Sequence, residues 1–167
     1  MRKDNKIQIK DNLNFLKNKN VDKVIRNDEW LYWSGKMIKV NYKKKNQLRN
    51  FVISNKRIYN IGMDGVFGNL FHKLVRRAIP IDKIECVTYS LISNNFIVHV
   101  PSQYDYYFIS PHKDDIVSYI LHFQKEMEMP PIAIFFVNDI NLYRFVKYEG
   151  HKQSKHPGME AEKMGFE

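Results

Sequence analysis

Apolar and polar residues alternate over short stretches beyond residue 36, and this period of two is typical of half-buried β-strands. Met37–Tyr42 alternates in this way, with lysine and asparagine set between apolar residues. The run 43–47 (Lys-Lys-Lys-Asn-Gln) predicts a polar turn, and Leu48–Ser54 is the expected return strand of a hairpin. A second turn leads into Arg57–Ile61, so this part of the chain is expected to be a series of short strands.

Further strands are expected beyond a loop that contains glycines at positions 62, 65 and 68. Turn residues at 93–95 (Ser-Asn-Asn) and 101–103 (Pro-Ser-Gln) separate short apolar stretches. The predicted strands are Arg77–Ile81, Ile84–Ser90, Phe96–Val100 and Tyr104–Ile109, with two later candidates at Ile132–Val137 and Leu142–Tyr148.

One helix is expected over Pro111–Glu128. Ser110 supplies a capping hydroxyl and Pro111 suits the first helical position. Apolar residues then recur every three or four positions and give the helix one apolar face: Ile116, Ile120, Phe123 and Met127. The pair Pro130-Pro131 ends the helix.

The two ends of the chain depart from this pattern. Residues 1–19 are rich in lysine and asparagine and predict a basic extension that lies on the domain or on a partner. A helix capped by Asn20 is expected to end near the aromatic cluster Trp30–Trp33, which packs on the sheet or anchors a partner. Residues 149–167 form a polar tail. The domain itself is therefore expected over residues 20–148.

Seven short strands followed by one amphipathic helix is the element order of a pleckstrin-homology-like barrel. The predicted fold is thus mostly β with a capping α-helix, carrying N- and C-terminal extensions. A length of 167 residues fits one such domain better than two.

Charge is concentrated in one quarter of the chain. Eleven basic residues and one acid lie between Lys36 and Arg77, a net charge of +10, whereas the whole chain carries +9. A field of this kind attracts polyanions such as phospholipid surfaces, nucleic acids or acidic protein polymers. The single cysteine excludes an internal disulfide framework, and no apolar run approaches the roughly 20 residues that span a bilayer, so a cytoplasmic protein without a secretory signal is expected.

No set of residues predicts catalysis or metal binding. The glycines at 62, 65 and 68 lack the spacing and the Lys-Ser/Thr of a phosphate loop, and the six histidines lack zinc-ligand spacing. Cys86 lies in the apolar stretch Ile84–Val87 and is expected in the core. Asp114 and Asp115 suit the first turn of the helix. We therefore expect a binding protein that is not an enzyme and uses no cofactor or metal.

Four segments in the right order resemble the tail homology 1 domain of class I myosins over residues 36–148. Residues 51–59 (FVISNKRIY) are similar to the family's strand, turn and strand around LTDKRLY, and residues 76–84 (RRAIPIDKI) to its KRRIPLSKI. Residues 94–101 (NNFIVHVP) resemble DNFFVLHVP, and residues 104–122 resemble the last strand and the helix. The chain lacks a motor and a P-loop, which indicates a stand-alone relative.

The resemblance implies a pleckstrin-homology-like fold that binds acidic phospholipids, often phosphoinositides. Lys39 and Arg49 match the first and last basic positions of the family's lipid motif, whereas Gln47 stands where the family has lysine or arginine. The lysine run retains a general attraction to anions. The basic residues near 73–77 either flank the same surface or simply lie at the start of a strand without a role in binding. The candidate anion-binding residues are Lys39, Lys43, Lys44, Lys45, Arg49, Lys73, Arg76 and Arg77.

Two functions remain open. The missing motor and the Gln47 departure favour a structural or adaptor component of a cytoskeletal assembly, docked on an acidic tubulin or actin surface, cytoskeleton-associated and with an axoneme of a cilium as one setting. The alternative is a peripheral module that binds acidic phospholipids or phosphoinositides at the inner face of the plasma membrane. Nucleic acid is disfavoured, because aromatic residues are not interleaved with the basic run.

Overall fold

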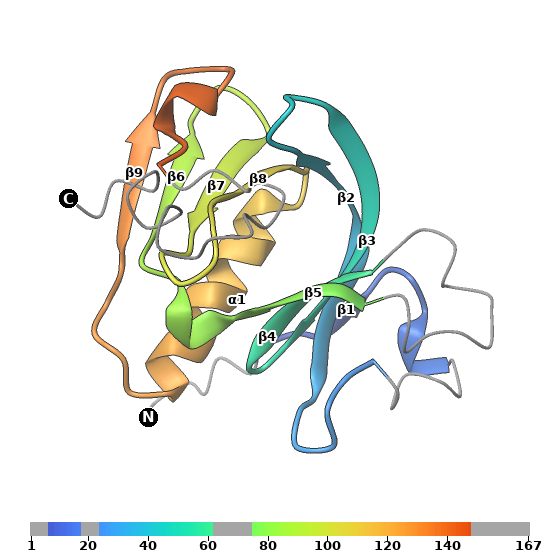
Figure 1. Ribbon diagram of the computed structural model, residues 1–167. Helices are drawn as coiled ribbons and strands as arrows, with labels where there is room; N and C mark the ends of the chain where they lie inside the picture. Colours follow the sequence, from blue (N-terminus) through green and yellow to red (C-terminus); the bar gives the residue numbers. More distant parts are fainter. Residues whose placement is uncertain (1–6, 18–23, 62–74, 148–167) are drawn as a thin grey trace, which may run out of the picture. The chain divides into compact units, whose positions relative to one another are not determined.

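The computed structural model describes residues 7–17, 24–61 and 75–147 (Figure 1). The chain divides into two compact units. The first comprises Met1–Lys36 and Asn50–Ile79, and the second comprises Met37–Arg49 and Pro80–Glu167. Strands β2 (Leu31–Val40) and β3 (Asn46–Ser54) each contribute residues to both units.

Short strands make up the first unit. Besides its parts of β2 and β3, it contains β1 (Lys10–Asp11), the 3-10 turn η1 (Phe15–Lys17), β4 (Arg57–Ile61) and most of β5 (Val75–Pro80). Strands β3 and β4 are antiparallel, with Ile53 opposite Ile58, and β1 runs parallel to β2, with Lys10 opposite Trp33. The N-terminal residues 10 and 11 are therefore part of the sheet.

A buried apolar cluster stabilises this unit and includes residues from the N-terminal segment. Its members are Phe15, Val24, Ile25, Leu31, Val52, Tyr59 and Ile61. The Asp11 carboxylate accepts hydrogen bonds from the backbone N–H groups of Phe15 and Leu16, each at 2.9 Å, and from the Ser34 hydroxyl at 2.5 Å. These contacts order the chain before Phe15, which is 1% exposed.

The prediction of a helix that begins at Asn20 is wrong for residues 24–30, the part of it that the structure describes. Residues 20–23 lie outside the described residues, and residues 24–30 form turns and irregular structure. The Glu29 N–H donates to the Arg26 carbonyl at 3.0 Å, which closes a turn instead of a helical repeat. Val24 and Ile25 are both buried in this apolar cluster although they lie in a turn and not in a helix.

The second unit has the strand order β2-β8-β7-β6-β9. Its further strands are β6 (Cys86–Ser90), β7 (Asn95–His99), β8 (Tyr106–Ile109) and β9 (Ala133–Val137). Neighbours are antiparallel except β9, which runs parallel to β6 with Thr88 opposite Phe135. Cys86 is buried at the start of β6, as expected.

The helix α1 (Lys113–Glu126) buries the face that its periodicity predicted, including Ile116, Ile120 and Phe123. It packs on the 3-10 turn η5 (Ile81–Lys83), where the Gln124 amide donates to the Ile81 carbonyl at 3.0 Å. The helix begins two residues later than expected, because the Ser110 hydroxyl accepts the His112 N–H at 3.0 Å in a turn before the helix.

The predicted class, mostly β with one helix, is confirmed, with two corrections. The described strand order ends at β5 and β9, so the sheet is open and "barrel" describes it loosely. The strand expected at Leu142–Tyr148 is absent from the part that the structure describes, where the 3-10 turn η6 (Tyr143–Phe145) stands instead. The Leu142 N–H donates to the Tyr107 hydroxyl at 3.0 Å, a side-chain partner that replaces a strand pairing.

Candidate functional site

The tip of the β2–β3 hairpin carries the lysine run on a well-defined turn. The Asn41 carbonyl accepts the Lys44 N–H at 2.8 Å, and the Asn41 side-chain oxygen accepts the backbone N–H groups of Lys43 and Lys45 at 2.9 and 3.0 Å. The Asn41 N–H donates to the Lys45 carbonyl at 3.0 Å and closes the hairpin. Lys44 has φ 59°, the left-handed conformation that such a three-residue connection needs at its last position.

The three lysines of this turn are exposed to solvent. The Lys44 ammonium lies over the Tyr143 ring, 4.5 Å from its centre, and the Lys43 ammonium lies 5.8 Å from the centre of the Tyr42 ring. The Tyr143 hydroxyl donates to the Tyr42 carbonyl at 2.9 Å, which attaches η6 to the hairpin. Among the described residues, no carboxylate forms an ion pair with these lysines. Their charge is therefore available to a partner.

Lys39 is half-buried in the second unit and points to a cluster of tyrosines. Its ammonium contacts the Tyr104 hydroxyl at 3.1 Å and lies 5.1 and 5.6 Å from the ring centres of Tyr104 and Tyr106. The two rings are themselves 4.4 Å apart. The aromatic faces stabilise the cation in place, so the Lys39 ammonium is held at a fixed position instead of moving freely in solvent.

Gln47 and Arg49 lie on β3 next to Lys39. Extending the antiparallel pairing inward from the closing contact between Asn41 and Lys45 places Gln47 opposite Lys39. Side chains alternate along a strand, so Arg49 projects to the same side as Gln47. Both are half-buried, whereas Leu48 between them is 47% exposed. The three positions of the lipid motif thus share one face, and the middle one carries no charge.

The remaining candidate residues belong to the first unit. Lys73 lies outside the described residues, and Arg76 lies in β5 with a side chain that is not described. Arg77 is half-buried in the same strand. The assignment of Lys73, Arg76 and Arg77 to an anion site stays a prediction.

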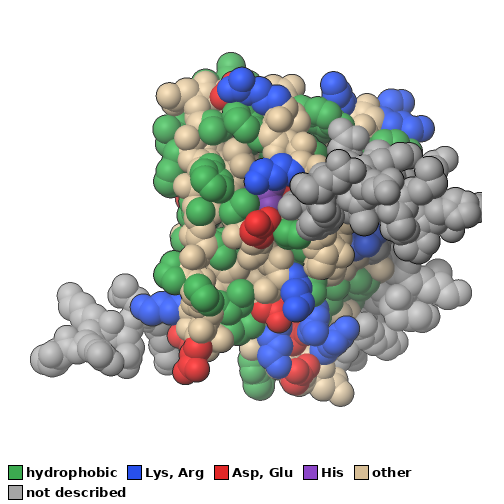
Figure 2. All heavy atoms as spheres, turned by 60° about the vertical axis from the view of Figure 1, so that its left-hand side comes forward, with side chains coloured by type: hydrophobic (Ala, Val, Ile, Leu, Met, Phe, Trp, Pro, Cys, Tyr) green, Lys and Arg blue, Asp and Glu red, His purple; other side chains and the backbone are tan. Residues whose placement is uncertain are grey.

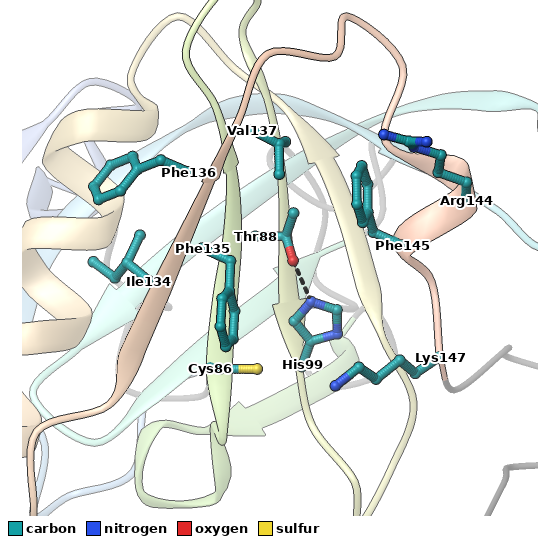
Figure 3. Close-up of a pocket in the computed structure, with 10 residues that line it drawn as sticks. All are labelled: Cys86, Thr88, His99, Ile134, Phe135, Phe136, Val137, Arg144, Phe145 and Lys147. Atoms are coloured by element: carbon teal, nitrogen blue, oxygen red, sulfur yellow. Dashed lines mark hydrogen bonds between the residues drawn. The ribbon is translucent and has the colours of Figure 1, made fainter.

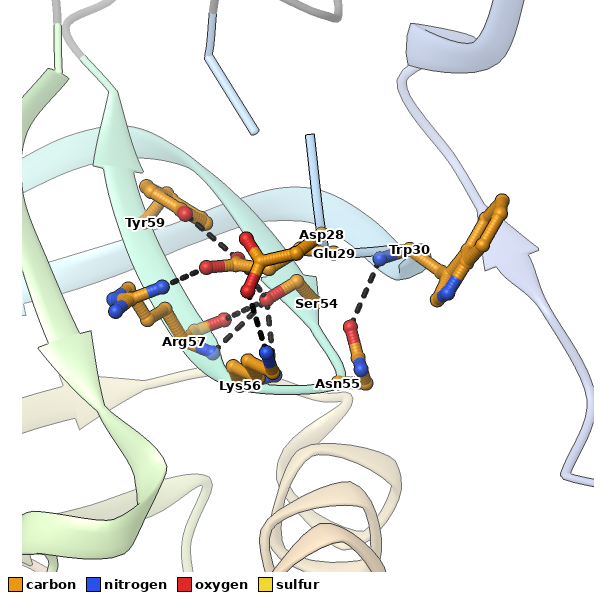
Figure 4. Close-up of polar contacts among 8 residues, drawn as sticks. All are labelled: Asp28, Glu29, Trp30, Ser54, Asn55, Lys56, Arg57 and Tyr59. Carbon is orange, nitrogen blue, oxygen red and sulfur yellow. Dashed lines mark hydrogen bonds and ion pairs between the residues drawn. The ribbon is translucent and has the colours of Figure 1, made fainter. Parts of the chain in front are cut away.

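Two other cations of the basic stretch between Lys36 and Arg77 form ion pairs within the first unit (Figure 4). The Arg57 guanidinium pairs with the Glu29 carboxylate, which is buried and also accepts the Ser54 and Tyr59 hydroxyls at 2.6 and 2.7 Å. Lys56 pairs with Asp28 at 2.5 Å, and this hydrogen bond lowers the pKa of the Asp28 carboxyl. The net charge of +10 counted between Lys36 and Arg77 therefore overstates the charge that is available to a partner.

A buried polar cluster that we did not expect from the sequence lies in the second unit. The Thr88 hydroxyl is 2.7 Å from His99 Nε2, and His99 Nδ1 is 2.8 Å from the Asp105 carboxylate, which also accepts the Lys147 N–H at 2.6 Å. Thr88 and His99 lie on adjacent strands and meet only through the register of β6 and β7. No spacing in the sequence signals such a pairing.

The described residues contain no group of three side chains that could hold a metal ion. Nor does any helix in the described part have the length and apolar character needed to cross a membrane.

Comparison with known proteins places the chain in a family. Residues 4–156 match the family described as "unconventional myosin tail, actin- and lipid-binding". A search of curated proteins found no match.

Among solved structures, the chain is similar to the hSac2 domain of the human phosphoinositide phosphatase Sac2, with 10% identity and a TM-score of 0.51 over 80% of this chain and 85% of that one. It is also similar to the N-terminal PH domain of human ARAP2, with 16% identity and a TM-score of 0.46 over 74% of this chain and 89% of that one.

The family match confirms the resemblance carried by the four motifs. The match extends beyond residues 36–148, the range of those motifs, toward both ends of the chain. The chain belongs to the unconventional myosin tail family, as a tail homology 1 domain.

Proposed function

We propose that this domain is a non-enzymatic module that docks on anionic phospholipid membranes through the tip of the β2–β3 hairpin. The observation that carries the proposal is the exposed run Lys43–Lys45, which is held on an ordered turn and forms no ion pair among the described residues. The family description, actin- and lipid-binding, supports the same class of partner.

The size of the effect follows from the charges. Each lysine near an anionic membrane surface contributes about 1 kcal/mol, so three contribute about 3 kcal/mol, which corresponds to an affinity factor of about 150. Because Asn41 already fixes the turn, little conformational entropy is lost when the lysines reach the surface. The attraction falls with added salt, as expected for exposed charges.

The face shared by Lys39, Gln47 and Arg49, beside the hairpin tip, is the part of the site that would determine lipid selectivity. Lys39 lies opposite the uncharged Gln47 on the neighbouring strand, and Arg49 lies two positions further along β3 on the same side. A multiply charged phosphoinositide headgroup gains most from several cations that converge on it, and this face supplies one fewer than the family motif. We therefore infer that the domain responds to the charge density of the membrane more than to one particular headgroup.

The test is co-sedimentation with vesicles of phosphatidylcholine containing phosphatidylserine. The triple variant Lys43→Glu, Lys44→Glu, Lys45→Glu should lose binding by about 100-fold or more. A matched control makes the same charge change at three exposed lysines that are not part of the turn, Lys36→Glu, Lys83→Glu and Lys125→Glu. Equal losses in both variants would show that net charge alone, and not the hairpin, determines binding.

A gain of function tests the selectivity. Gln47→Lys restores the basic residue at the middle position of the motif and should raise affinity for vesicles containing phosphatidylinositol bisphosphate about 5-fold, with a smaller gain on phosphatidylserine. Leu48→Lys adds the same charge on the opposite side of β3 and serves as the control. An equal gain from both substitutions would contradict the assignment of the Lys39 face as the headgroup site.

A second candidate is docking on actin filaments, which the family description also names. Actin filaments are acidic and would meet the same hairpin by the same electrostatics. Parallel co-sedimentation with actin filaments and with microtubules separates the cytoskeletal alternatives. The description does not mention tubulin, so our proposal does not extend to microtubules or axonemes.

A further inference from the structure

The second unit contains a cavity that the hairpin site does not use (Figure 3). It has a volume of about 660 Å³, within the range of small-molecule sites. Residues of β6 and β7 form part of its lining, namely Cys86, Thr88 and His99. Residues of β9 and residues 144–147 complete it, with Phe135 and Phe145 among them.

The Thr88 hydroxyl of β6 and Nε2 of His99 on β7 are hydrogen-bonded to each other. His99 lies between the Thr88 hydroxyl and the Asp105 carboxylate, at 2.7 and 2.8 Å. Burial raises the pKa of the Cys86 thiol, so this group stays neutral at physiological pH. The Thr88 hydroxyl and His99 Nε2 are thus occupied by each other, whereas His99 Nδ1 lies beside the Asp105 carboxylate, out of the reach of solvent and without a hydrogen bond.

Most of the remaining lining is apolar, and part of it is exposed to solvent. Ile134, Phe135, Val137 and Phe145 contribute hydrocarbon surface. Phe135 is 52% exposed, and its neighbour Phe136 is 59% exposed. Figure 2 brings the β9 side forward and shows hydrophobic side chains spread over this face. Large exposed aromatic residues beside a cavity indicate a surface that binds something apolar.

Charge in the lining has one sign. Among the described residues that line the cavity, Arg144 and Lys147 are basic and none is an aspartate or glutamate. Arg144 pairs with Asp139 at 3.1 Å, whereas the Lys147 ammonium has no ion pair or hydrogen bond among the described residues. Figure 3 shows the Lys147 side chain extending toward Cys86 and His99. The Lys147 backbone N–H donates to the Asp105 carboxylate at 2.6 Å, which fixes the point from which this side chain starts at the edge of the cavity.

An apolar cavity with one unpaired cation at its edge is suited to an amphiphile. We propose that this cavity binds a single-chain lipid with an anionic head, with the acyl chain against Phe135, Val137 and Phe145 and the head at Lys147. The shared chemistry is one hydrocarbon chain ending in a carboxylate, as in a fatty acid, or in a phosphate, as in a lysophospholipid. This site is separate from the hairpin tip and goes beyond the membrane docking proposed above.

The test titrates the full chain with soluble monomeric amphiphiles, without a bilayer. Laurate and dodecyl phosphate represent the two head groups, and dodecyltrimethylammonium carries the opposite charge on the same chain. Both anions should bind with saturation in calorimetry and shift the NMR signals of Thr88, His99 and Phe145. The cation should bind about 10-fold more weakly. The better of the two anions identifies the head group.

Two variants locate the site. Lys147→Glu should weaken both anions about 5-fold and strengthen the cation, whereas Lys83→Glu, the same change at an exposed residue outside the cavity, should alter none of them. Phe135→Ala should weaken all three ligands, and Ile140→Ala, at another exposed apolar residue, should not. Non-saturable binding, indifference to the head charge, or shifts confined to the hairpin lysines would overturn the proposal. These outcomes would not affect the membrane-docking proposal, which is tested separately with vesicles and the hairpin variants.

Discussion

Glu29 offers the sharpest test of how the first unit is held together. Its carboxylate is fully buried and lies among three donors from β3 and β4: the Ser54 hydroxyl at 2.6 Å, the Tyr59 hydroxyl at 2.7 Å and the Arg57 guanidinium (Figure 4). The Arg57 side chain is only 20% exposed, so it cannot turn fully to solvent. Glu29→Ala leaves a mostly buried cation and two buried hydroxyls without their acceptor.

The expected cost can be worked from these contacts. Removing one partner of a buried ion pair costs about 3–5 kcal/mol, because the other charge is left uncompensated. Glu29→Gln keeps the shape and one acceptor oxygen but loses the charge, so we expect a smaller loss of about 1–2 kcal/mol. Asp28→Asn breaks the neighbouring exposed pair with Lys56 and should change the free energy of unfolding little.

Urea unfolding followed by tryptophan fluorescence suits this test. The chain has two tryptophans, and the buried one, Trp33, lies in the same unit as Glu29. The fluorescence transition therefore reports on that unit, even if the two units unfold separately. A Glu29→Ala variant that loses less than about 1 kcal/mol would refute the view that this carboxylate neutralises Arg57 in the core.

Three further predictions concern the second unit and the pH dependence. Ile120→Asp places a charge on the buried face of α1 and should unfold that unit, seen as loss of helical circular dichroism, whereas Ser118→Asp on the exposed side should not. Lys44→Gly relieves the left-handed backbone and should stabilise the chain by up to about 1 kcal/mol in urea unfolding. It should also weaken vesicle binding, and a destabilised variant would contradict the turn geometry. Burial raises the pKa of three tyrosines in the folded state, Tyr59, Tyr107 and Tyr119. Above pH 10 the folded chain therefore keeps protons that the unfolded chain releases, so the free energy of unfolding should fall as the pH rises.

Lys113 opposes this alkaline trend. Its ammonium contacts the Ser90 and Ser93 carbonyls, and burial lowers its pKa. A lysine with a lowered folded pKa makes stability rise with pH between its folded value and the ordinary 10.5. The tyrosines outnumber it, so the net slope should be negative above pH 10, and a flat or rising stability there would contradict their burial. Tyr107→Phe should make the slope shallower.

The strands and the helix were accessible to sequence analysis because local periodicity determines them. Arg57–Ile61 coincides with β4, and the apolar face of α1 was identified from its spacing. The N-terminal segment was harder, since a lysine-rich stretch does not show that Phe15 is buried or that Asp11 forms three hydrogen bonds. Burial of Phe15 needs residues of β2, β3 and β4, and one of the three hydrogen bonds comes from Ser34 of β2, 23 positions away.

The candidate site was accessible in part for the same reason. The lysine turn follows from a polar run between two strands, and the motif match identified Lys39 and Arg49. The aromatic contacts of Lys39 and Lys44 involve Tyr104 and Tyr143, which are 65 and 99 positions away and carry no local signal. Pairing of Arg57 with Glu29 likewise depends on tertiary structure, so a count of charges along the chain overestimated the field.

The attachment of Tyr143 to the hairpin has a thermodynamic consequence. Its hydroxyl is bonded to the Tyr42 carbonyl and its ring lies under Lys44, while Arg144 and Phe145, the next residues, line the cavity. A cavity ligand whose affinity depends on the position of this segment changes the affinity of the hairpin for its partner, and linkage requires the effect to be equal in both directions. A domain with this connection would report the composition of a membrane and the supply of a soluble lipid as one combined signal.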